Sequence, residues 1–393
     1  MIYVGIDVAK QKHDCFITNS YGEVLRDVFT ISNSMDGFRE LHESILSFNP
    51  NPSPNNIRIG LEATGHYSNN LIDFLVDKNL NPVVFNPLST NLYRKGHSLR
   101  KTKTDKSDAR FITMMLITED IKPYSQVSYH IRELKSLTRH RFRLVQERSR
   151  FKISYTRILD IVFPELHSIV WSITQKSMLL TLLELPNTKA ISQCHLTRLV
   201  TLLEKNSHGR YHRDKAVDIR ELARNSIGSN SPALAFELQQ IIRSILFLQE
   251  QIDLLDKQIK EVMFEIDSPI MSIPGISFTL GAIILAEIGD VLRFDTPAKL
   301  LAFAGLEPST HQSGNFTSSH ATMVKRGSKY LRWAVINAVR LVCMRDIAFK
   351  AYRDKKLQEG KHYFVASSHT ARKLMRVIFY MLKNNQSFIA QAA

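Results

Sequence analysis

The sequence predicts an α/β domain at the N-terminus, followed by helical structure to the C-terminus. Three observations support this α/β plus α class. Short β-rich runs alternate with helical patterns over the first 120 residues, aliphatic residues then repeat in heptads, and helical patterns rich in Arg and Lys end the chain. A length of 393 residues fits two or three domains at about 150 residues each. We expect three, over residues 1–125, 126–266 and 267–393.

Strands and helices alternate in the N-terminal part. Strands are expected over residues 2–8, 13–18, 24–30, 57–62 and 82–86, and helices over residues 34–48, 68–78 and 104–116. A turn at residues 20–23 joins the second and third strands, and Asn33 or Ser34 caps the first helix. This order predicts a mixed sheet flanked by helices.

The middle part is predicted to be helical. Residues 131–166 form a strongly basic helical pattern, whereas residues 186–232 give only short helical pieces. An a/d seam follows, made of Leu234, Leu238, Ile241, Ile245, Leu248, Ile252, Leu255, Ile259, Val262 and Ile266. Two interpretations remain open for it: a long helix packed inside one domain, or an intermolecular coiled coil.

The overall composition indicates a polyanionic partner and a reducing compartment. Lys and Arg number 52 against 37 Asp and Glu, which leaves a net charge of +15 and favours nucleic acid. Three scattered cysteines exclude a disulfide framework and a four-thiolate zinc site, so we expect a cytoplasmic protein. The N-terminus lacks a secretory pattern, and the longest apolar stretch, residues 278–286, is far below the roughly 20 residues of a membrane span.

Two strands of the N-terminal part carry acids on their polar face. Side chains alternate along a strand, so Asp7 lies on the face opposite the aliphatic residues of its strand, as Glu62 does in its own. Each acid has a glycine two residues earlier on the same face, Gly5 and Gly60. Such a glycine leaves a hollow that a ligand or another backbone can approach.

Two more acids, Asp105 and Asp108, lie three residues apart and therefore share one helix face. Four clustered carboxylates would repel one another unless a divalent cation held them, and oxygen ligands favour Mg²⁺ or Mn²⁺ over zinc. The alternative places Asp7 and Glu62 at solvated strand ends and pairs Asp108 with Lys101 or Arg110.

A run of cations surrounds these acids. It contains Arg94, Lys95, Arg100, Lys101, Lys103 and Lys106. Such a run is usually a solvated basic face, but beside a metal site in a basic protein it favours a phosphate backbone. We therefore expect these residues to bind nucleic acid.

Three sequence blocks carry a family resemblance. Residues 5–10 (GIDVAK), 61–65 (LEATG) and 103–109 (KTDKSDA) resemble the signature blocks of DEDD-type insertion-sequence transposases, the one-hundred-ten family, which is related to the Piv DNA invertases and includes RNA-guided bridge recombinases. The resemblance implies a RuvC-like N-terminal domain with a ribonuclease-H fold, whose metal-binding acids here are Asp7, Glu62, Asp105 and Asp108. The strand and helix order predicted above agrees with that fold.

The C-terminal part contains two further motifs. Residues 273–277 (IPGIS) resemble a helix-hairpin-helix turn whose amides, including that of Gly275, can hold a phosphate, although a Pro-Gly corner is the commoner structure. Residues 303–308 (FAGLEP), 311–314 (HQSG) and 325–327 (KRG) resemble the second conserved region of the same family. That resemblance implies Ser313 as the nucleophile, with Lys325 and Arg326 neutralising the attacked phosphate.

The leading hypothesis is a bacterial DNA transposase or site-specific recombinase that acts on nucleoid DNA through a serine–phosphate intermediate. The resemblance implies that a composite centre joins the acids and Ser313, and that a guide (bridge) RNA pairs with donor and target DNA. The heptad seam and the need for several active centres favour a homodimer or homotetramer. Two alternatives remain: a metal-dependent nuclease or junction resolvase acting by hydrolysis, and a non-catalytic nucleic-acid-binding protein.

Overall fold

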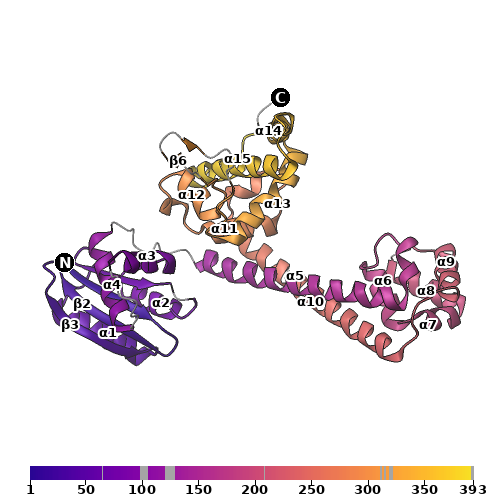
Figure 1. Cartoon of the computed structure of the whole chain (residues 1–393), viewed down its shortest axis with the longest axis horizontal. Coiled ribbons are helices and arrows are strands. Elements are labelled where there is room, and N and C mark those ends of the chain that lie inside the picture. The colour runs from indigo at the N-terminus through magenta and orange to yellow at the C-terminus, as the bar shows by residue number, and fades with distance from the viewer. Residues whose placement is uncertain are drawn as a thin grey trace. The chain divides into compact units, whose positions relative to one another are not determined.

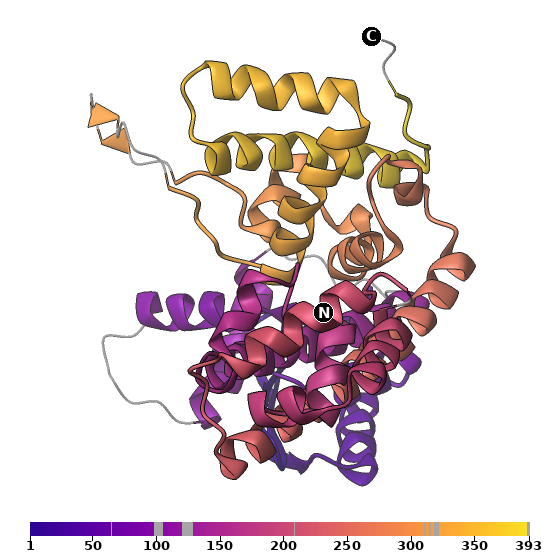
Figure 2. The same ribbon diagram turned by 90° about the vertical axis from the view of Figure 1, so that its right-hand side faces the viewer.

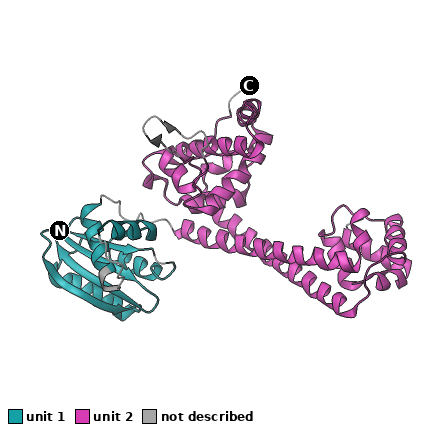
Figure 3. Ribbon diagram, in the orientation of Figure 1, with its two compact units in different colours: residues 1–127 teal, residues 128–393 magenta. Residues whose placement is uncertain are grey.

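The chain folds into two compact units, Met1–Val127 and Ser128–Ala393 (Figure 3). The computed structural model describes residues 1–63, 65–97, 105–119, 129–207, 209–309, 312–313, 316–317 and 322–390, with the backbone alone at 105–107, 312–313 and 316–317. None of the helices in these ranges is both long and apolar enough to cross a membrane.

The first unit is built on the predicted mixed sheet. Its strands are β1 (Ile2–Val8), β2 (Lys12–Asn19), β3 (Val24–Ser32), β4 (Ile57–Glu62) and β5 (Val83–Phe85), in the order β3-β2-β1-β4-β5. The β1–β2 and β2–β3 pairs are antiparallel, whereas β4 runs parallel to both β1 and β5. The predicted strands are therefore confirmed to within about two residues at their ends.

Helices cover both faces of this sheet (Figure 1). The aliphatic face of β1 packs with α1 (Met35–Phe48) and α2 (Asn69–Asp77) in one core. Ser34 caps α1, since its side chain accepts a hydrogen bond from the amide of Gly37, which decides between the two predicted caps. The other face is covered by α4 (Asp105–Thr118), whose Ile112, Met115 and Leu116 pack with β5.

A helix that the sequence analysis does not expect follows β5 directly. It is α3 (Pro87–His97), in which Thr90 alone of its described residues is buried. With almost no apolar face, α3 has no helical period to detect. Its start does carry a signal: proline occupies the first position, and the side chain of Asn86 accepts a hydrogen bond from the amide of Leu88 at 2.9 Å.

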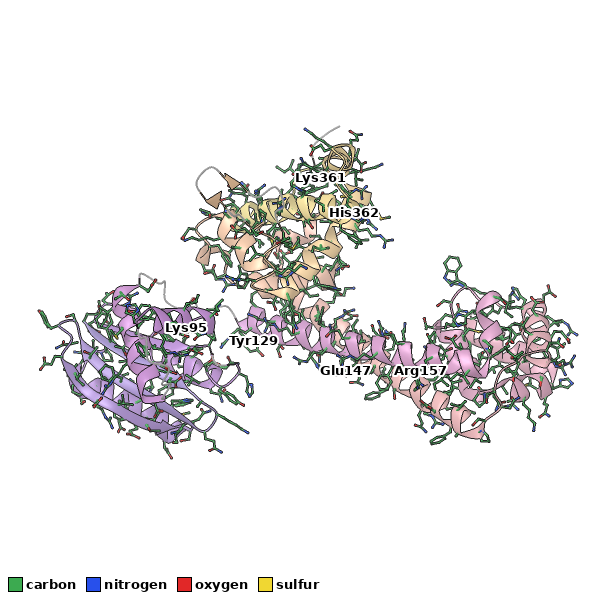
Figure 4. The ribbon with its side chains drawn as sticks, viewed as in Figure 1. Lys95, Tyr129, Glu147, Arg157, Lys361 and His362 are labelled. Carbon is green, nitrogen blue, oxygen red and sulfur yellow. The ribbon has the colours of Figure 1, made fainter. Side chains whose placement is uncertain are left out.

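The second unit contains a long antiparallel helix pair, α5 (Tyr129–Val162) and α10 (Pro232–Ile266), with Glu147 and Arg157 along α5 (Figure 4). Ion pairs fix its register: Arg141 contacts Asp256 at 2.6 Å, and Arg157 contacts Glu237 at 3.2 Å. Most of the predicted seam is buried. The seam thus packs inside the chain, as the first of the two interpretations states.

One end of the α5–α10 pair carries a small helical core. It contains α6 (Lys176–Glu184), α7 (Thr188–Gln193), α8 (Leu196–Ser207) and α9 (Arg213–Arg224). The sequence resolves only short pieces here because α7, with six residues, is too short for a clear period. In α9 two of the three buried residues are alanines, so its apolar face is small.

The other end carries the C-terminal core. It contains α11 (Phe278–Ile288), α12 (Pro297–Ala304), α13 (Lys329–Arg345), α14 (Ile347–Gln358) and α15 (Tyr363–Asn384). Between α12 and α13 a short antiparallel pair, β6 (Gln312–Ser313) and β7 (Phe316–Thr317), stands away from the helices (Figure 2).

Candidate functional site

Three of the predicted acids line one cavity in the first unit. Asp7 is the next-to-last residue of β1, Glu62 ends β4 and Asp108 lies in the first turn of α4. The cavity has a volume of about 450 Å³, and its walls also include Thr90, Asn91 and Arg94 of α3. The side chain of the fourth acid, Asp105, lies outside the described residues. The structure thus brings together acids from three separate segments of sequence.

Glycines in the sheet explain how α4 comes so close. A Cβ atom on Gly5 would lie 2.1 Å from the Thr113 hydroxyl and 2.3 Å from the Ala109 carbonyl oxygen of α4. A Cβ on Gly60 would lie 2.7 Å from Leu116. The predicted hollow is therefore filled by the backbone of α4 at Gly5 and by the Leu116 side chain at Gly60. This close packing of α4 places Asp108 on the same cavity as Asp7 and Glu62.

Two of these carboxylates are held by α3. Arg94 contacts both oxygens of Asp108, at 3.1 and 3.2 Å, and also donates to the side chain of Asn91. The Thr90 hydroxyl donates to Glu62 at 2.6 Å. The Arg94 and Asp108 side chains are only 25% and 14% exposed, so their attraction is less screened by water than that of a surface pair. Asp108 thus pairs with Arg94 and not with Arg110, which contacts Asp27.

The donor set of the cavity suits a hard divalent cation by its chemistry. Carboxylate oxygens are the ligands that Mg²⁺ and Mn²⁺ prefer. Within the described ranges, however, no three His, Cys, Asp or Glu side chains converge closely enough to hold an ion. The Arg94 guanidinium is a cation paired with Asp108 in this arrangement. A metal would therefore compete with Arg94 for this carboxylate.

The other predicted cations of this region fall into two groups. Lys95 is exposed on α3 (Figure 4). Arg100, Lys101 and Lys103 lie outside the described residues, and Lys106 is described by its backbone alone.

The sequence analysis overlooks one contributor to this site, α3, which supplies Thr90 and Asn91. It also overlooks Asp14 on β2, which lies directly opposite Asp7 in the antiparallel register and is 5% exposed. Asp14 is not among the described residues that line the cavity, and its carboxylate accepts a hydrogen bond from the Thr30 hydroxyl. Residues opposite each other in such a pair share a face. The tight turn between the first two strands could have predicted this pairing.

The candidate nucleophile Ser313 lies in the second unit on a two-stranded hairpin, where it pairs with Phe316. The base of the hairpin is firmly anchored. The amide of Ser309 donates to the Thr322 carbonyl at 2.7 Å, and the amide of Val324 donates to the Glu307 carbonyl at 3.0 Å. Lys325 and Arg326 are exposed beside this base.

Two glycines with positive φ close the hairpin base. Gly305 has φ +66° and Gly327 has φ +84°, and a Cβ on either would lie 2.0–2.1 Å from a carbonyl oxygen of the facing segment. Arg332 of α13 donates to the carbonyls of Ala304 and Lys325 at 3.2 and 3.1 Å. The two ends of the Ser313 segment are thus held side by side.

A buried carboxylate connects this base to the long helix α5. Glu287 of α11 is 1% exposed and accepts two hydrogen bonds from Arg139, at 2.7 and 3.0 Å. It also accepts one at 2.7 Å from the hydroxyl of Ser328, the N-cap residue of α13. Burial opposes ionisation, but these bonds outweigh it and lower the pKa of Glu287.

The candidate helix-hairpin-helix glycine has a packing role. Gly275 has φ +95°, and a Cβ there would lie 2.6 Å from the backbone of Leu341 in α13. This close approach alone requires a glycine. Its predicted contact with a phosphate remains a prediction.

Comparisons with known proteins identify the class. A family model described as "Transposase" matches residues 4–164, which include the acidic cavity, and a model described as "Transposase IS116/IS110/IS902 family" matches residues 267–354, which include the hairpin. The fold and these two regions define a transposase, an enzyme that processes DNA.

Relatives that match nearly the whole chain or a part of it agree. An uncharacterized 44.8 kDa protein of insertion element IS116 from Streptomyces clavuligerus is 26% identical over 98% of this chain and 96% of its own. The pilin gene-inverting protein of Moraxella lacunata is 24% identical over 98% and 97%. The transposase for insertion sequence element IS1111A from Coxiella burnetii is 34% identical over 22% and 23%. The chain belongs to the IS116/IS110/IS902 family of transposases.

Proposed function

We propose that this transposase cleaves and rejoins DNA through a covalent bond between Ser313 and a phosphate. Attack of the Ser313 hydroxyl oxygen on a phosphodiester forms a serine–phosphate ester and releases a deoxyribose hydroxyl, which takes up the proton. Attack of another deoxyribose hydroxyl on this ester rejoins the strands and returns the hydroxyl to Ser313. The observation that supports phosphoryl transfer most is that Asp7, Glu62 and Asp108 line one cavity. The family model that matches residues 267–354, which include Ser313, supports the choice of this region for the nucleophile.

The proposal includes a RuvC-like, ribonuclease-H fold for the first unit. In support, the antiparallel strands β1–β3 are extended on the β1 side by the parallel strands β4 and β5, with helices on both faces. Asp7, Glu62, Asp105 and Asp108 would hold Mg²⁺ or Mn²⁺. When bound, the metal stabilises negative charge on the attacked phosphate. Arg94, which contacts both oxygens of Asp108, would compete with such a metal for this carboxylate.

Lys325 and Arg326 have a related role in the second unit. Both are exposed next to the hairpin base, where their charges can neutralise a phosphate close to Ser313. We propose that Lys95, Arg100, Lys101, Lys103, Lys106 and Gly275 contribute to backbone binding, which does not depend on base sequence.

The experiment that tests the nucleophile is trapping with a suicide DNA substrate, followed by mass spectrometry of the tryptic peptides. We expect a nucleotide on the peptide that contains Ser313. Ser313→Ala abolishes this adduct and strand exchange but leaves DNA binding intact. Ser309→Ala is the matched control, because the Ser309 hydroxyl accepts a hydrogen bond from the Thr322 amide and is occupied in the hairpin base.

Other outcomes assign other functions. Released DNA ends without attached protein would indicate hydrolysis by a metal-dependent nuclease and refute the covalent step. If Asp7→Asn and Glu62→Gln leave every measurable activity in place, the chain is a nucleic-acid-binding protein without catalysis.

We also propose a guide RNA and assembly into a homodimer or homotetramer. The net charge of +15 supports binding of RNA in addition to DNA. The seam of α10 does not support the dimer, since α5 of the same chain buries it. The assembly therefore depends on the need for several active centres in recombination. Loss of strand exchange after ribonuclease treatment, restored by added RNA, tests the guide.

A further inference from the structure

A second cavity, in the second unit, has no assigned role. It has a volume of about 420 Å³ and lies between α5, α11 and α13. Phe142 and Trp333 provide its aromatic walls, and Ile283 of α11 provides an aliphatic surface. Cavities of this size with a few polar groups commonly bind a small planar ligand.

Trp333 is held at this cavity and remains accessible. The ring of Phe142 meets those of Trp333 and Tyr330 edge-on, at centroid distances of 5.3 and 5.0 Å and interplanar angles of 86° and 85°. This arrangement fixes the indole without covering it, since Trp333 is 40% exposed. An exposed, oriented indole is a surface on which a flat ring can stack.

Polar and cationic groups complete the lining. Arg141 is fixed by two bonds to Asp256, at 2.6 and 3.0 Å, while Gln146, Ser149 and Arg150 are exposed at the rim. The amide of Gln146 can donate and accept hydrogen bonds, and the hydroxyl of Ser149, which donates to the Val145 carbonyl at 2.8 Å, can accept one. Among the residues that the structure describes, no carboxylate lines this cavity.

We propose that this cavity binds one unstacked nucleobase of a nucleic-acid strand, stacked on Trp333 and followed by its phosphate at Arg150. The exposed, oriented indole of Trp333 favours a nucleobase over an acidic peptide, and Arg150 at the rim favours it over an apolar segment. Trp333 lies in the second turn of α13. The N-cap residue of this helix, Ser328, ends the segment 305–328, which contains Ser313. The inference rests on the nucleic-acid substrate of the proposed function, but not on the chemistry of Ser313.

The two tryptophans of the chain make a direct test possible. Trp171 is 96% exposed on the small helical core, so Trp171→Phe leaves Trp333 as the reporter of the cavity, and Trp333→Phe leaves Trp171 as the matched control. Each variant of the full chain is titrated with a single-stranded DNA oligonucleotide, an RNA of the same sequence, a blunt DNA duplex and an abasic DNA strand. Fluorescence emission and the dissociation constant are measured.

Base stacking predicts quenching of Trp333 by a strand with bases, no quenching by the abasic strand, and no change at Trp171. Trp333→Ala should raise the Kd of the base-containing strand about fivefold or more, which corresponds to about 1 kcal/mol, without changing that of the abasic strand. If only the DNA strand or only the RNA strand quenches Trp333, the inference is supported and the kind of strand that binds is identified.

Three results would overturn it: equal quenching by the abasic strand, quenching at Trp171 alone, or a Trp333 signal that follows protein concentration without nucleic acid. The last result would assign the cavity to a second copy of the chain. The titration is repeated with Ser313→Ala, where quenching is expected to persist. A failure of the covalent mechanism is therefore distinguishable from a failure of this inference.

Discussion

The buried pair of Glu287 and Arg139 should be the most sensitive electrostatic contact of the second unit. The structure joins the two residues across 148 positions of sequence by two hydrogen bonds. Glu287→Ala removes both of them, together with the bond from Ser328, and leaves the Arg139 guanidinium without its carboxylate partner. Removing one member of a buried ion pair destabilises the fold far more than replacing both members by apolar residues.

The structure sets the size of the effect. Loss of one partner of a buried ion pair costs about 3–5 kcal/mol. Glu287 is 1% exposed but the Arg139 side chain is 39% exposed, so water can partly solvate the freed cation. We therefore expect the lower end, about 3 kcal/mol. Ser328→Ala, which removes one bond to Glu287 and the cap of α13, should cost about 1–2 kcal/mol.

The assay is urea unfolding of the full chain, followed by far-ultraviolet circular dichroism. A second variant, Glu287→Met with Arg139→Met, replaces the pair by apolar side chains and should recover most of the loss. The reasoning is refuted if Glu287→Ala lowers the free energy of unfolding by less than about 1 kcal/mol. It is also refuted if the double variant is no more stable than Glu287→Ala.

The dependence on pH gives an independent check. Because the bonds from Arg139 and Ser328 outweigh burial, the folded-state pKa of Glu287 lies below its ordinary value. The stabilisation from this group is therefore complete above the unfolded pKa of about 4.3 and is lost as the pH falls through the lowered folded value. The stability difference between the wild type and Glu287→Gln should shrink over that interval.

Two further predictions concern the first unit. Gly5→Ala forces the sheet and α4 apart and should cost about 1–3 kcal/mol in thermal unfolding, whereas Gly96→Ala, with no atom within 4 Å of the new Cβ, should be neutral or stabilising; equal effects would contradict the packing argument. Arg94→Met should destabilise the unit by about 1–3 kcal/mol without divalent cation, and Mn²⁺ should raise its melting temperature more than that of the wild type. Lys95→Met is the control at an exposed position. If Mn²⁺ raises the melting temperature of Arg94→Met no more than that of the wild type, Arg94 does not compete with a metal.

The parts of the fold with a strong local period could be predicted from the sequence. Alternation in β1 and β4 placed Asp7 and Glu62 on one face, and the seam of α10 followed from its heptads. The helix α3 could not be predicted in this way, because Thr90 is its single buried residue among those described. Its existence depends on a cap and a proline, which act over only one turn.

Pairings between distant side chains were beyond prediction for a different reason. The sequence offers Asp108 several cations within 15 residues, and only the packing of α3 beside α4 selects Arg94. Likewise, nothing in the pattern of α11 identifies Arg139 as the partner of Glu287. Such choices are made by tertiary geometry, whereas periodicity reports only which face a residue occupies.

The glycines at the centre of the sheet connect fold and chemistry in the first unit. Any larger residue at Gly5 would push α4 outward, and Asp108, which precedes Ala109 in the contact, would move away from Asp7. A glycine in the interior of a strand weakens the strand, but here it allows the backbones of β1 and α4 to approach closely. The same approach places Asp108 on the cavity that Asp7 and Glu62 also line, where Arg94 pairs with it. The packing thus sets a cation against this carboxylate before any substrate arrives.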